Sequence, residues 1–394
     1  MDKIEEVLSR GVTNIIPGKA ELEKLLRSGN KLNIYLGIKL NIYLGIDPTA
    51  TKIHIGHGVP LRKLQEFVEL GHKVTFLIGD FTALIGDSSD KESERPILTY
   101  DEIQENFKTY KEQASKILDF SKVEVKFNSE WLKKLGFADV VKLCQHFSVG
   151  DFVGRELIKK RLNAGTKVGL HEFLYPVMQG YDSYFMNTDI QIGGADQTFN
   201  MQAGRTLQKD MRSKDSFVLV TGYLEGTDGR KMSKSWGNAI WISDSPGEMF
   251  GKVMSLHDNL ILQYFINATR TPDEKIKEVE KRLKDGENPL NLKKELGVAL
   301  VTEFHSKETA EKAEKNFKET FQEKRPTFDI KVASGDSLAV TIAPFTSLES
   351  ISEAKRLIKQ NAVDVDGKMV DNPSYIVKSG DEIKVGSRTF LKAK

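Results

Sequence analysis

Short apolar runs alternate with amphipathic helical patterns through most of the first 240 residues of the chain. The runs with the length and β-branched content of strands are residues 40–46, 73–79, 123–127, 189–192 and 217–220. Helical patterns lie between them, for example over residues 101–118 and 171–185, and residues 1–30 are predicted to form two short amphipathic helices. Such alternation is typical of a parallel sheet with helices on both faces. We therefore expect an α/β domain whose ligands bind at the carboxyl ends of the strands.

The pattern changes twice in the second half of the chain. Residues 245–325 are dense in charge and predict helices over 272–283, 289–305 and 307–321. From about residue 335, a basic amphipathic helix over 352–359 is followed by short alternating runs separated by turn signals. The sequence therefore predicts three domains: α/β over 1–240, helical over 241–326 and a small α+β domain over 335–394.

An eight-residue segment occurs twice in succession: residues 31–38 (KLNIYLGI) are repeated without change as residues 39–46. Because eight is even, both copies keep the period-two alternation of a strand. Only the second copy is joined to the turn Asp47-Pro48-Thr49. We expect the second copy to form the strand, with the first displaced into the preceding connection, so that Tyr43 rather than Tyr35 points into the site.

Composition excludes several classes of protein. The single cysteine, Cys144, rules out a disulfide framework and a thiolate zinc site. No apolar run approaches the ~20 residues that span a bilayer, and the N-terminus lacks the apolar core of a signal peptide. We expect a cytoplasmic protein without a membrane anchor. Since the net charge is only +2, any contact with nucleic acid must come from local basic patches.

The first candidate site is a turn at residues 45–49 followed by His54-Ile55-Gly56-His57. A helix that starts here offers free N–H groups and a positive dipole end to a triphosphate. Gly56 lets a flat base approach the backbone, and His54 and His57 can donate hydrogen bonds to phosphate and ribose. Because Pro60 is comfortable only in a first turn, the helix is predicted to begin near residue 57 or 58. The alternative is a turn with two surface histidines.

The second candidate is Lys231-Met232-Ser233-Lys234-Ser235, on a polar, Gly-rich loop. Two mobile ammonium groups can hold a leaving pyrophosphate, and the glycines of the loop allow it to move. By itself, such a segment would be an exposed basic loop.

A third cluster, Asp87, Lys91 and Arg95, has a spacing of four residues. It indicates either a salt-bridged helix face or a carboxylate for a substrate ammonium together with two cations for phosphate.

The stretch at residues 171–187 places Tyr175, Gln179 and Asp182 on one face of a helix. An acid, an amide and a phenol on an otherwise apolar helix indicate a buried specificity pocket; the alternative is a solvated face. Since Pro176 would interrupt the helix, we expect a start or a kink near it.

The next stretch, residues 191–197, is a predicted strand that enters a glycine turn and a helix. In it, Asp196 is placed to accept ribose hydroxyls, unless it is an ordinary N-cap.

Taken together, these motifs resemble the paired motifs of class I aminoacyl-tRNA synthetases, and nearly the whole chain is similar to the bacterial tyrosyl-tRNA synthetase family. The resemblance implies a Rossmann-like catalytic domain, a helical anticodon-binding domain and an S4-like RNA-binding domain. It implies that tyrosine is bound by Tyr43, Asp87, Tyr175, Gln179, Asp182 and Gln197, with Tyr43 and Asp182 at its hydroxyl. ATP would be bound by Gly45, Asp47, Gly56, Gly194, Asp196 and Lys234. The catalytic set would be Thr49, His54, His57, Lys91, Arg95, Lys231 and Lys234. RNA would meet Lys355, Arg356 and Lys359, unless that surface is merely a solvated helix face.

The implied reaction is activation of L-tyrosine by ATP to tyrosyl-adenylate, followed by transfer to tRNA(Tyr). Mg²⁺ would accompany ATP without a dedicated protein site, and the family implies a homodimer. Two alternatives stay open. A tryptophanyl-tRNA synthetase shares both ATP motifs, although Gln179 and Asp182 argue against it. A catalytically idle RNA-binding homologue would bind RNA without activating an amino acid.

Overall fold

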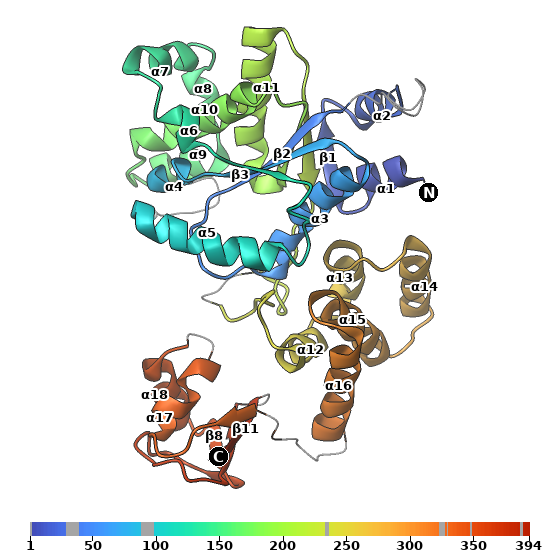
Figure 1. The fold of residues 1–394 in the computed structure, drawn as a ribbon, viewed down its shortest axis with the longest axis vertical. Coiled ribbons are helices and arrows are strands. Elements are labelled where there is room, and N and C mark those ends of the chain that lie inside the picture. The colour runs from blue at the N-terminus through green and yellow to red at the C-terminus, as the bar shows by residue number, and fades with distance from the viewer. Residues whose placement is uncertain are drawn as a thin grey trace. The chain divides into compact units, whose positions relative to one another are not determined.

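The computed structural model describes residues 2–28, 39–87, 98–232, 236–322, 328, 330–346, 349–386 and 389–394. The chain forms two compact units, Met1–Leu224 and Glu225–Lys394 (Figure 1). The sequence-based domain boundaries near residues 240 and 326 stay a prediction. Within the described ranges, every helix is too short or too polar to cross a membrane.

The first unit is built on a six-stranded sheet of order β1-β6-β5-β2-β3-β4. Its strands are β1 (Val12–Ile16), β2 (Asn41–Ile46), β3 (Lys73–Ile78), β4 (Glu124–Phe127), β5 (Ile190–Gly194) and β6 (Phe217–Thr221). The pairs from β6 to β4 are all parallel, which confirms the five predicted strands and the α/β class. In Figure 1 the sheet lies between α3 on one side and α10 and α11 on the other.

One strand was not expected from the sequence. Residues 1–30 contain α1 (Lys3–Ser9) and α2 (Lys19–Ser28), but between them β1 pairs antiparallel with β6 at the edge of the sheet. Only Ile15 of β1 is buried, so the local hydrophobic pattern is too weak to identify it. Its strand conformation is explained by hydrogen bonding to β6, which is about 200 residues away in the chain.

Nine α-helices of this unit lie among the described residues after β2. They are α3 (Ile55–Glu69), α4 (Thr82–Ile85), α5 (Tyr100–Ala114), α6 (Ser129–Leu132), α7 (Phe137–Cys144), α8 (Val149–Val153), α9 (Glu156–Asn163), α10 (Leu170–Phe185) and α11 (Thr198–Arg212). The predicted start of α3 near residue 57 or 58 was wrong, because α3 begins at Ile55 with Pro60 inside it. A start near Pro176 was also wrong, because α10 begins at Leu170; the alternative of a kink there stays a prediction. Each proline removes only the bond to the carbonyl four residues earlier, and packing of the helix faces in the core offsets that loss.

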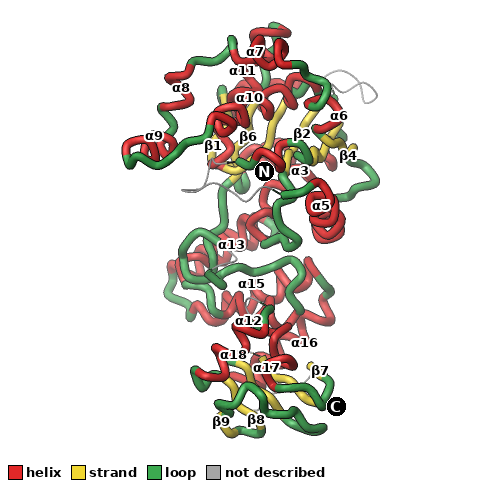
Figure 2. Tube along the Cα trace, turned by 90° about the vertical axis from the view of Figure 1, so that its left-hand side faces the viewer, coloured by secondary structure: helices red, strands yellow, loops and turns green. Residues whose placement is uncertain are grey.

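The second unit contains helices and a separate small sheet (Figure 2). Its helices are α12 (Pro246–Met254), α13 (Ile261–Ala268), α14 (Asp273–Lys284), α15 (Pro289–Phe304), α16 (Lys307–Phe317), α17 (Leu338–Ile342) and α18 (Ile351–Lys359). The sheet has the order β7-β11-β10-β8-β9, from β7 (Ile330–Val332), β8 (Val363–Val365), β9 (Lys368–Met369), β10 (Glu382–Val385) and β11 (Thr389–Ala393). These elements confirm the predicted helices and the α+β character of the C-terminal part; α12, α13 and α17 were not predicted.

Candidate active site

The order of the sheet identifies where a ligand can bind. From β2 the chain passes to β3 on one side, whereas β5 is added on the other side of β2. The crevice beyond the carboxyl ends of β2 and β5 is therefore a topological switch point, where open α/β sheets bind ligands. Asp47 follows β2, Asp87 follows β3, and Gly194 ends β5. The sheet thus brings three of the predicted segments to one edge.

The second copy of the repeat forms β2, as predicted, and the first copy lies outside the described residues. Tyr43 is 3% exposed, and its hydroxyl donates a hydrogen bond to Gln191 Oε1 at 3.1 Å. Burial, together with the charge of Asp182, raises the pKa of the Tyr43 phenol well above its usual value. The Tyr43 phenol therefore stays neutral, and its hydroxyl acts only as a donor and acceptor of hydrogen bonds.

Asp182 lies on the buried side of α10 and is 2% exposed. Its Oδ1 accepts a hydrogen bond from Trp131 Nε1 at 2.7 Å, and its Oδ2 accepts one from Asn128 Nδ2 at 3.1 Å. Burial raises the pKa of Asp182 to about 8, although the two N–H donors oppose that rise. Sequence reasoning missed both donors. A signal was present for Asn128, which directly follows a predicted strand and so lies at the ligand-binding edge.

Asp47, predicted to contact ATP, holds a pocket residue in place. Its Oδ2 accepts from the Tyr175 hydroxyl at 2.8 Å, and its Oδ1 accepts from Thr82 Oγ1 at 2.8 Å. A Cβ at Gly79 would collide with the Asp47 carboxylate, so a glycine is needed there. Burial and the carboxylates of Asp47 and Asp87 raise the pKa of Tyr175 well above 10.

A third group of polar side chains lies at the start of α11. Gln197 Nε2 donates to Asp87 Oδ2 at 2.8 Å and to Asp196 Oδ2 at 3.2 Å. Asp87 is buried, whereas Asp196 is exposed and Gln179 is half-buried on α10. The N-cap of α11 is Gln197, so the alternative interpretation of Asp196 as a helix N-cap is wrong.

The histidine motif forms the start of α3. His54 is the N-cap of this helix, and its ring stacks on that of His57 with 3.8 Å between the centroids. A Cβ on Gly56 would lie 2.9 Å from His54 Nδ1, so the glycine leaves room for the stacked pair. Before the helix, the Thr49 backbone N–H donates to the Asp47 carbonyl at 2.8 Å. This places a helix N-terminus with two imidazoles shortly after the carboxyl end of β2.

The lysine motif belongs to the second unit. Lys231 is exposed and forms a backbone bridge with Glu225, while Met232 is buried. The Asn238 side chain donates to the Lys231 carbonyl at 3.1 Å and to Asp228 at 2.8 Å, which closes the loop on itself.

Three predicted cations, Lys91, Arg95 and Lys234, lie outside the described residues.

The three basic residues predicted to bind RNA are all exposed on α18. Arg356 donates to both carboxylate oxygens of Glu353, at 2.8 and 2.6 Å, and to Gln360 at 3.0 Å. The positive charge of Arg356 is therefore partly neutralised by Glu353 of the same helix, whereas the side chains of Lys355 and Lys359 are exposed to solvent.

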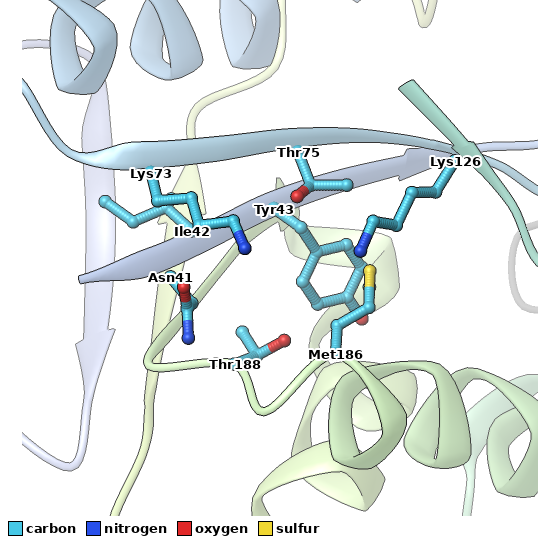
Figure 3. A pocket seen from close by; sticks show the side chains of 8 residues that line it. All are labelled: Asn41, Ile42, Tyr43, Lys73, Thr75, Lys126, Met186 and Thr188. Carbon is cyan, nitrogen blue, oxygen red and sulfur yellow. The ribbon is translucent and has the colours of Figure 1, made fainter. Parts of the chain in front are cut away.

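A separate small polar hollow, with a cavity volume of about 10 Å³, lies toward the amino ends of β2 and β3. In Figure 3, Thr75, Lys126 and Met186 extend toward the ring of Tyr43. Tyr43 is the only predicted site residue among those that line it. Across the described parts of the chain, no group of three or more His, Cys, Asp or Glu side chains could hold a metal ion.

The sequence matches two families. The family described as tRNA synthetases class I (W and Y) matches residues 37–322, and the S4 domain family matches residues 347–383.

Relatives match over nearly their whole length. The tyrosine–tRNA ligase of Carboxydothermus hydrogenoformans is 44% identical, covering 98% of this chain and 96% of the relative. That of Thermotoga maritima is 39% identical with the same coverage. Tyrosine–tRNA ligase 2 of Vibrio cholerae is 41% identical over 100% of this chain and 99% of its own.

Solved structures share the fold. A C-terminally truncated mitochondrial tyrosyl-tRNA synthetase of Aspergillus nidulans has a TM-score of 0.65 at 22% identity, covering 81% of this chain and 94% of that one. The enzyme of Archaeoglobus fulgidus, solved in complex with L-tyrosine, has a TM-score of 0.62 at 22% identity, covering 79% of this chain and 100% of that one. With the sequence matches above, the chain belongs to the class I tRNA synthetases of the tryptophan and tyrosine group, and within it to the tyrosine–tRNA ligases.

Proposed function

We propose that the edge of the sheet formed by β2, β3 and β5, together with α10, holds the tyrosine and ATP of a tyrosine–tRNA ligase. The tyrosine carboxylate attacks the α-phosphorus of ATP, so that an O–P bond forms and pyrophosphate leaves. A hydroxyl at the 3′ end of tRNA(Tyr) then attacks the carbonyl carbon of tyrosyl-adenylate and displaces AMP. The observation that carries this proposal is a chain of hydrogen bonds that joins Tyr175 to Asp182 through Asp47, Thr82 and Asn128. Buried Tyr43 lies in the same cluster as Trp131, which donates to Asp182.

At one end of this pocket, Tyr43 and Asp182 are assigned to the phenol of tyrosine. Both are buried, and each still has lone pairs beyond those that its protein partners use. A ligand without a hydroxyl leaves this acceptor capacity without a donor, which costs about 1–3 kcal/mol for each group. Trp131 and Asn128 hold the Asp182 carboxylate in place. This polar end favours tyrosine over phenylalanine, and over the larger indole of tryptophan.

At the other end, Asp87, Tyr175 and Gln179 are assigned to the ammonium group. Asp47 positions Tyr175 through the bond between its carboxylate and the Tyr175 hydroxyl. Because Gln197 binds Asp87, it lies next to the ammonium position and is assigned to the carboxyl end of tyrosine.

The nucleotide half of the site is assigned to the start of α3 and the end of β5. The helix N-terminus and the His54 and His57 rings meet the phosphates, beside Gly45, Thr49 and Gly56. Asp196, beside Gly194, accepts the ribose hydroxyls. The proposed cations for pyrophosphate are Lys91, Arg95, Lys231 and Lys234.

No covalent nucleophile is assigned, so rate enhancement rests on alignment of the reactants and on cations that meet developing negative charge. Mg²⁺ is proposed to arrive with ATP, where it would neutralise phosphate charge, and the protein supplies the surrounding N–H groups and side-chain cations.

We further propose that the protein is cytoplasmic and acts as a homodimer, with tRNA bound in part through Lys355, Arg356 and Lys359. Large apolar side chains on the first unit support the dimer: Phe137 is 86% exposed, Leu170 78% and Val149 76%. Exposed apolar side chains of this size are common at interaction sites, and a second copy is the commonest partner. Sedimentation of the full chain tests this assignment.

The experiment that tests the proposed function is ATP–pyrophosphate exchange with tyrosine, using tryptophan and phenylalanine as controls. Exchange that depends on tyrosine alone is expected. Exchange that depends on tryptophan instead would support a tryptophanyl-tRNA synthetase. No exchange by a folded protein that still binds RNA would support the catalytically idle homologue.

A further inference from the structure

A buried glutamine on β5 lies against the Tyr43 hydroxyl and was not among the predicted site residues. Gln191 is 1% exposed, and the parallel register of β2 and β5 pairs it directly with Tyr43. Its Oε1 accepts a hydrogen bond from the Tyr43 hydroxyl at 3.1 Å, while its Nε2 donates one to the backbone carbonyl of Met201 on α11 at 2.9 Å. Gln191 thus connects a residue assigned to the substrate with the backbone of a helix.

The partners of this amide determine which way its two ends point. A backbone carbonyl can only accept, so the nitrogen of Gln191 must face Met201 and the oxygen must face Tyr43. Gly204 provides the space for this arrangement. A Cβ there would lie 2.6 Å from Oε1 and 2.7 Å from Nε2 of Gln191. The only proton of the Tyr43 hydroxyl is therefore directed to Gln191, and lone pairs remain for the substrate side.

We propose that Gln191 determines the substrate range of the pocket by turning the Tyr43 hydroxyl into a hydrogen-bond acceptor, so that Tyr43 and Asp182 form a pair of acceptors that also fits aromatic amines. The expected additional substrate is phenylalanine with a para amino group. This inference rests on the proposed role of Tyr43 and Asp182 at the tyrosine hydroxyl.

The chemistry of the para group explains the expectation. A phenol carries one proton, so it can donate to Tyr43 or to Asp182 but not to both. An aromatic amine of similar size carries two N–H groups and can donate to both acceptors. Phenylalanine donates to neither, so the lone pairs of Tyr43 and Asp182 that face the ligand find no donor. In the absence of Gln191, Tyr43 could turn its proton toward the phenol oxygen, which would favour tyrosine over the amine.

The experiment compares kcat/KM for tyrosine, 4-aminophenylalanine and phenylalanine in pyrophosphate exchange by the full chain. Assays at about pH 8.5 lie above the pKa of Asp182, which burial raises to about 8, so that most of its carboxyl groups are ionised. For the wild-type protein, kcat/KM for the amine is expected to lie within about tenfold of that for tyrosine, and kcat/KM for phenylalanine far below both. In Gln191→Met, the preference for tyrosine over the amine should rise about tenfold, the size of one hydrogen bond.

Two matched variants separate this role from a structural one. Gln208 is also a buried glutamine; it donates to the backbone carbonyls of Ser183 and Thr188, so Gln208→Met should lower stability without moving the substrate ratio. In a Tyr43→Phe background, Gln191→Met should no longer change the ratio.

Three results would overturn the inference: a wild-type protein that activates tyrosine but not the amine, an unchanged ratio in Gln191→Met, or an equal change in Gln208→Met. A folded wild-type protein that shows no exchange with tyrosine would instead refute the proposed function.

Discussion

The helix that carries Tyr175 and Asp182 is anchored by a buried ion pair, and breaking this pair should be costly. Arg161 on α9 is 4% exposed and Glu172 on α10 is 2% exposed. Arg161 Nη1 and Nη2 donate to the two Glu172 oxygens at 2.6 and 3.1 Å. Glu172 Oε1 also accepts the backbone N–H of Gly169 at 2.7 Å. Glu172→Ala removes all three bonds and leaves the Arg161 charge buried without its carboxylate.

Removing one partner of a buried ion pair costs about 3–5 kcal/mol, because the remaining charge stays desolvated. At about 2–4 °C per kcal/mol for a unit of this size, the melting temperature of the first unit should fall by about 6–20 °C. The double variant with Arg161→Met and Glu172→Leu should lose less free energy of unfolding than the sum of the losses in the two single variants, since neither charge is left alone. Glu105→Ala, which breaks an exposed pair with Lys108, should leave the melting temperature nearly unchanged.

Urea unfolding should be followed by the fluorescence of Trp131, which is buried in the first unit. A background with Trp236→Phe and Trp241→Phe removes the tryptophans of the second unit, so the signal reports the first unit alone. This reasoning would be refuted if Glu172→Ala lowered the free energy of unfolding by less than about 1 kcal/mol. It would also be refuted if the loss in the double variant equalled the sum of the losses in the two single variants.

Four further predictions concern the site itself. Asp182→Ala should reduce the preference for tyrosine over phenylalanine in kcat/KM, because it removes a buried acceptor for the phenol; unchanged discrimination would contradict the assignment. The folded-state pKa of Asp182, about 8, lies above its unfolded value, so its contribution to stability is present at low pH and is lost as pH rises toward and through 8. Urea titrations should therefore show wild type losing stability relative to Asp182→Asn over that window, and parallel pH curves would exclude the effect. Lys231→Ala and Lys234→Ala should slow single-turnover adenylate formation by roughly 10- to 1000-fold while sparing tyrosine binding; formation at the wild-type rate would argue against their role on pyrophosphate. Deleting residues 31–38 should leave the melting temperature and exchange activity intact or improved, because β2 comes from the second copy; a collapse in melting temperature would show that the first copy is structural.

The elements of the sheet could be predicted because their signals are local. Five strands and the main helices follow from the period of apolar residues, and the histidine and lysine motifs follow from residue types at short spacing. The polar face of α10 was also visible, since Tyr175, Gln179 and Asp182 need only helical geometry to share it. These features depend on neighbours within a few residues, so a single sequence contains them.

The partners of those residues could not be predicted, because the chain brings them together from far apart. Asp182 meets Trp131 across 51 residues, Asp47 meets Tyr175 across 128, and Tyr43 meets Gln191 across 148. β1 likewise becomes a strand only by pairing with β6. The sequence by itself determined the five parallel strands, the main helices and the residue types of the motifs. Only the tertiary structure decided which buried polar groups satisfy one another, because a hydrogen bond depends on distance and direction in space rather than on separation along the chain.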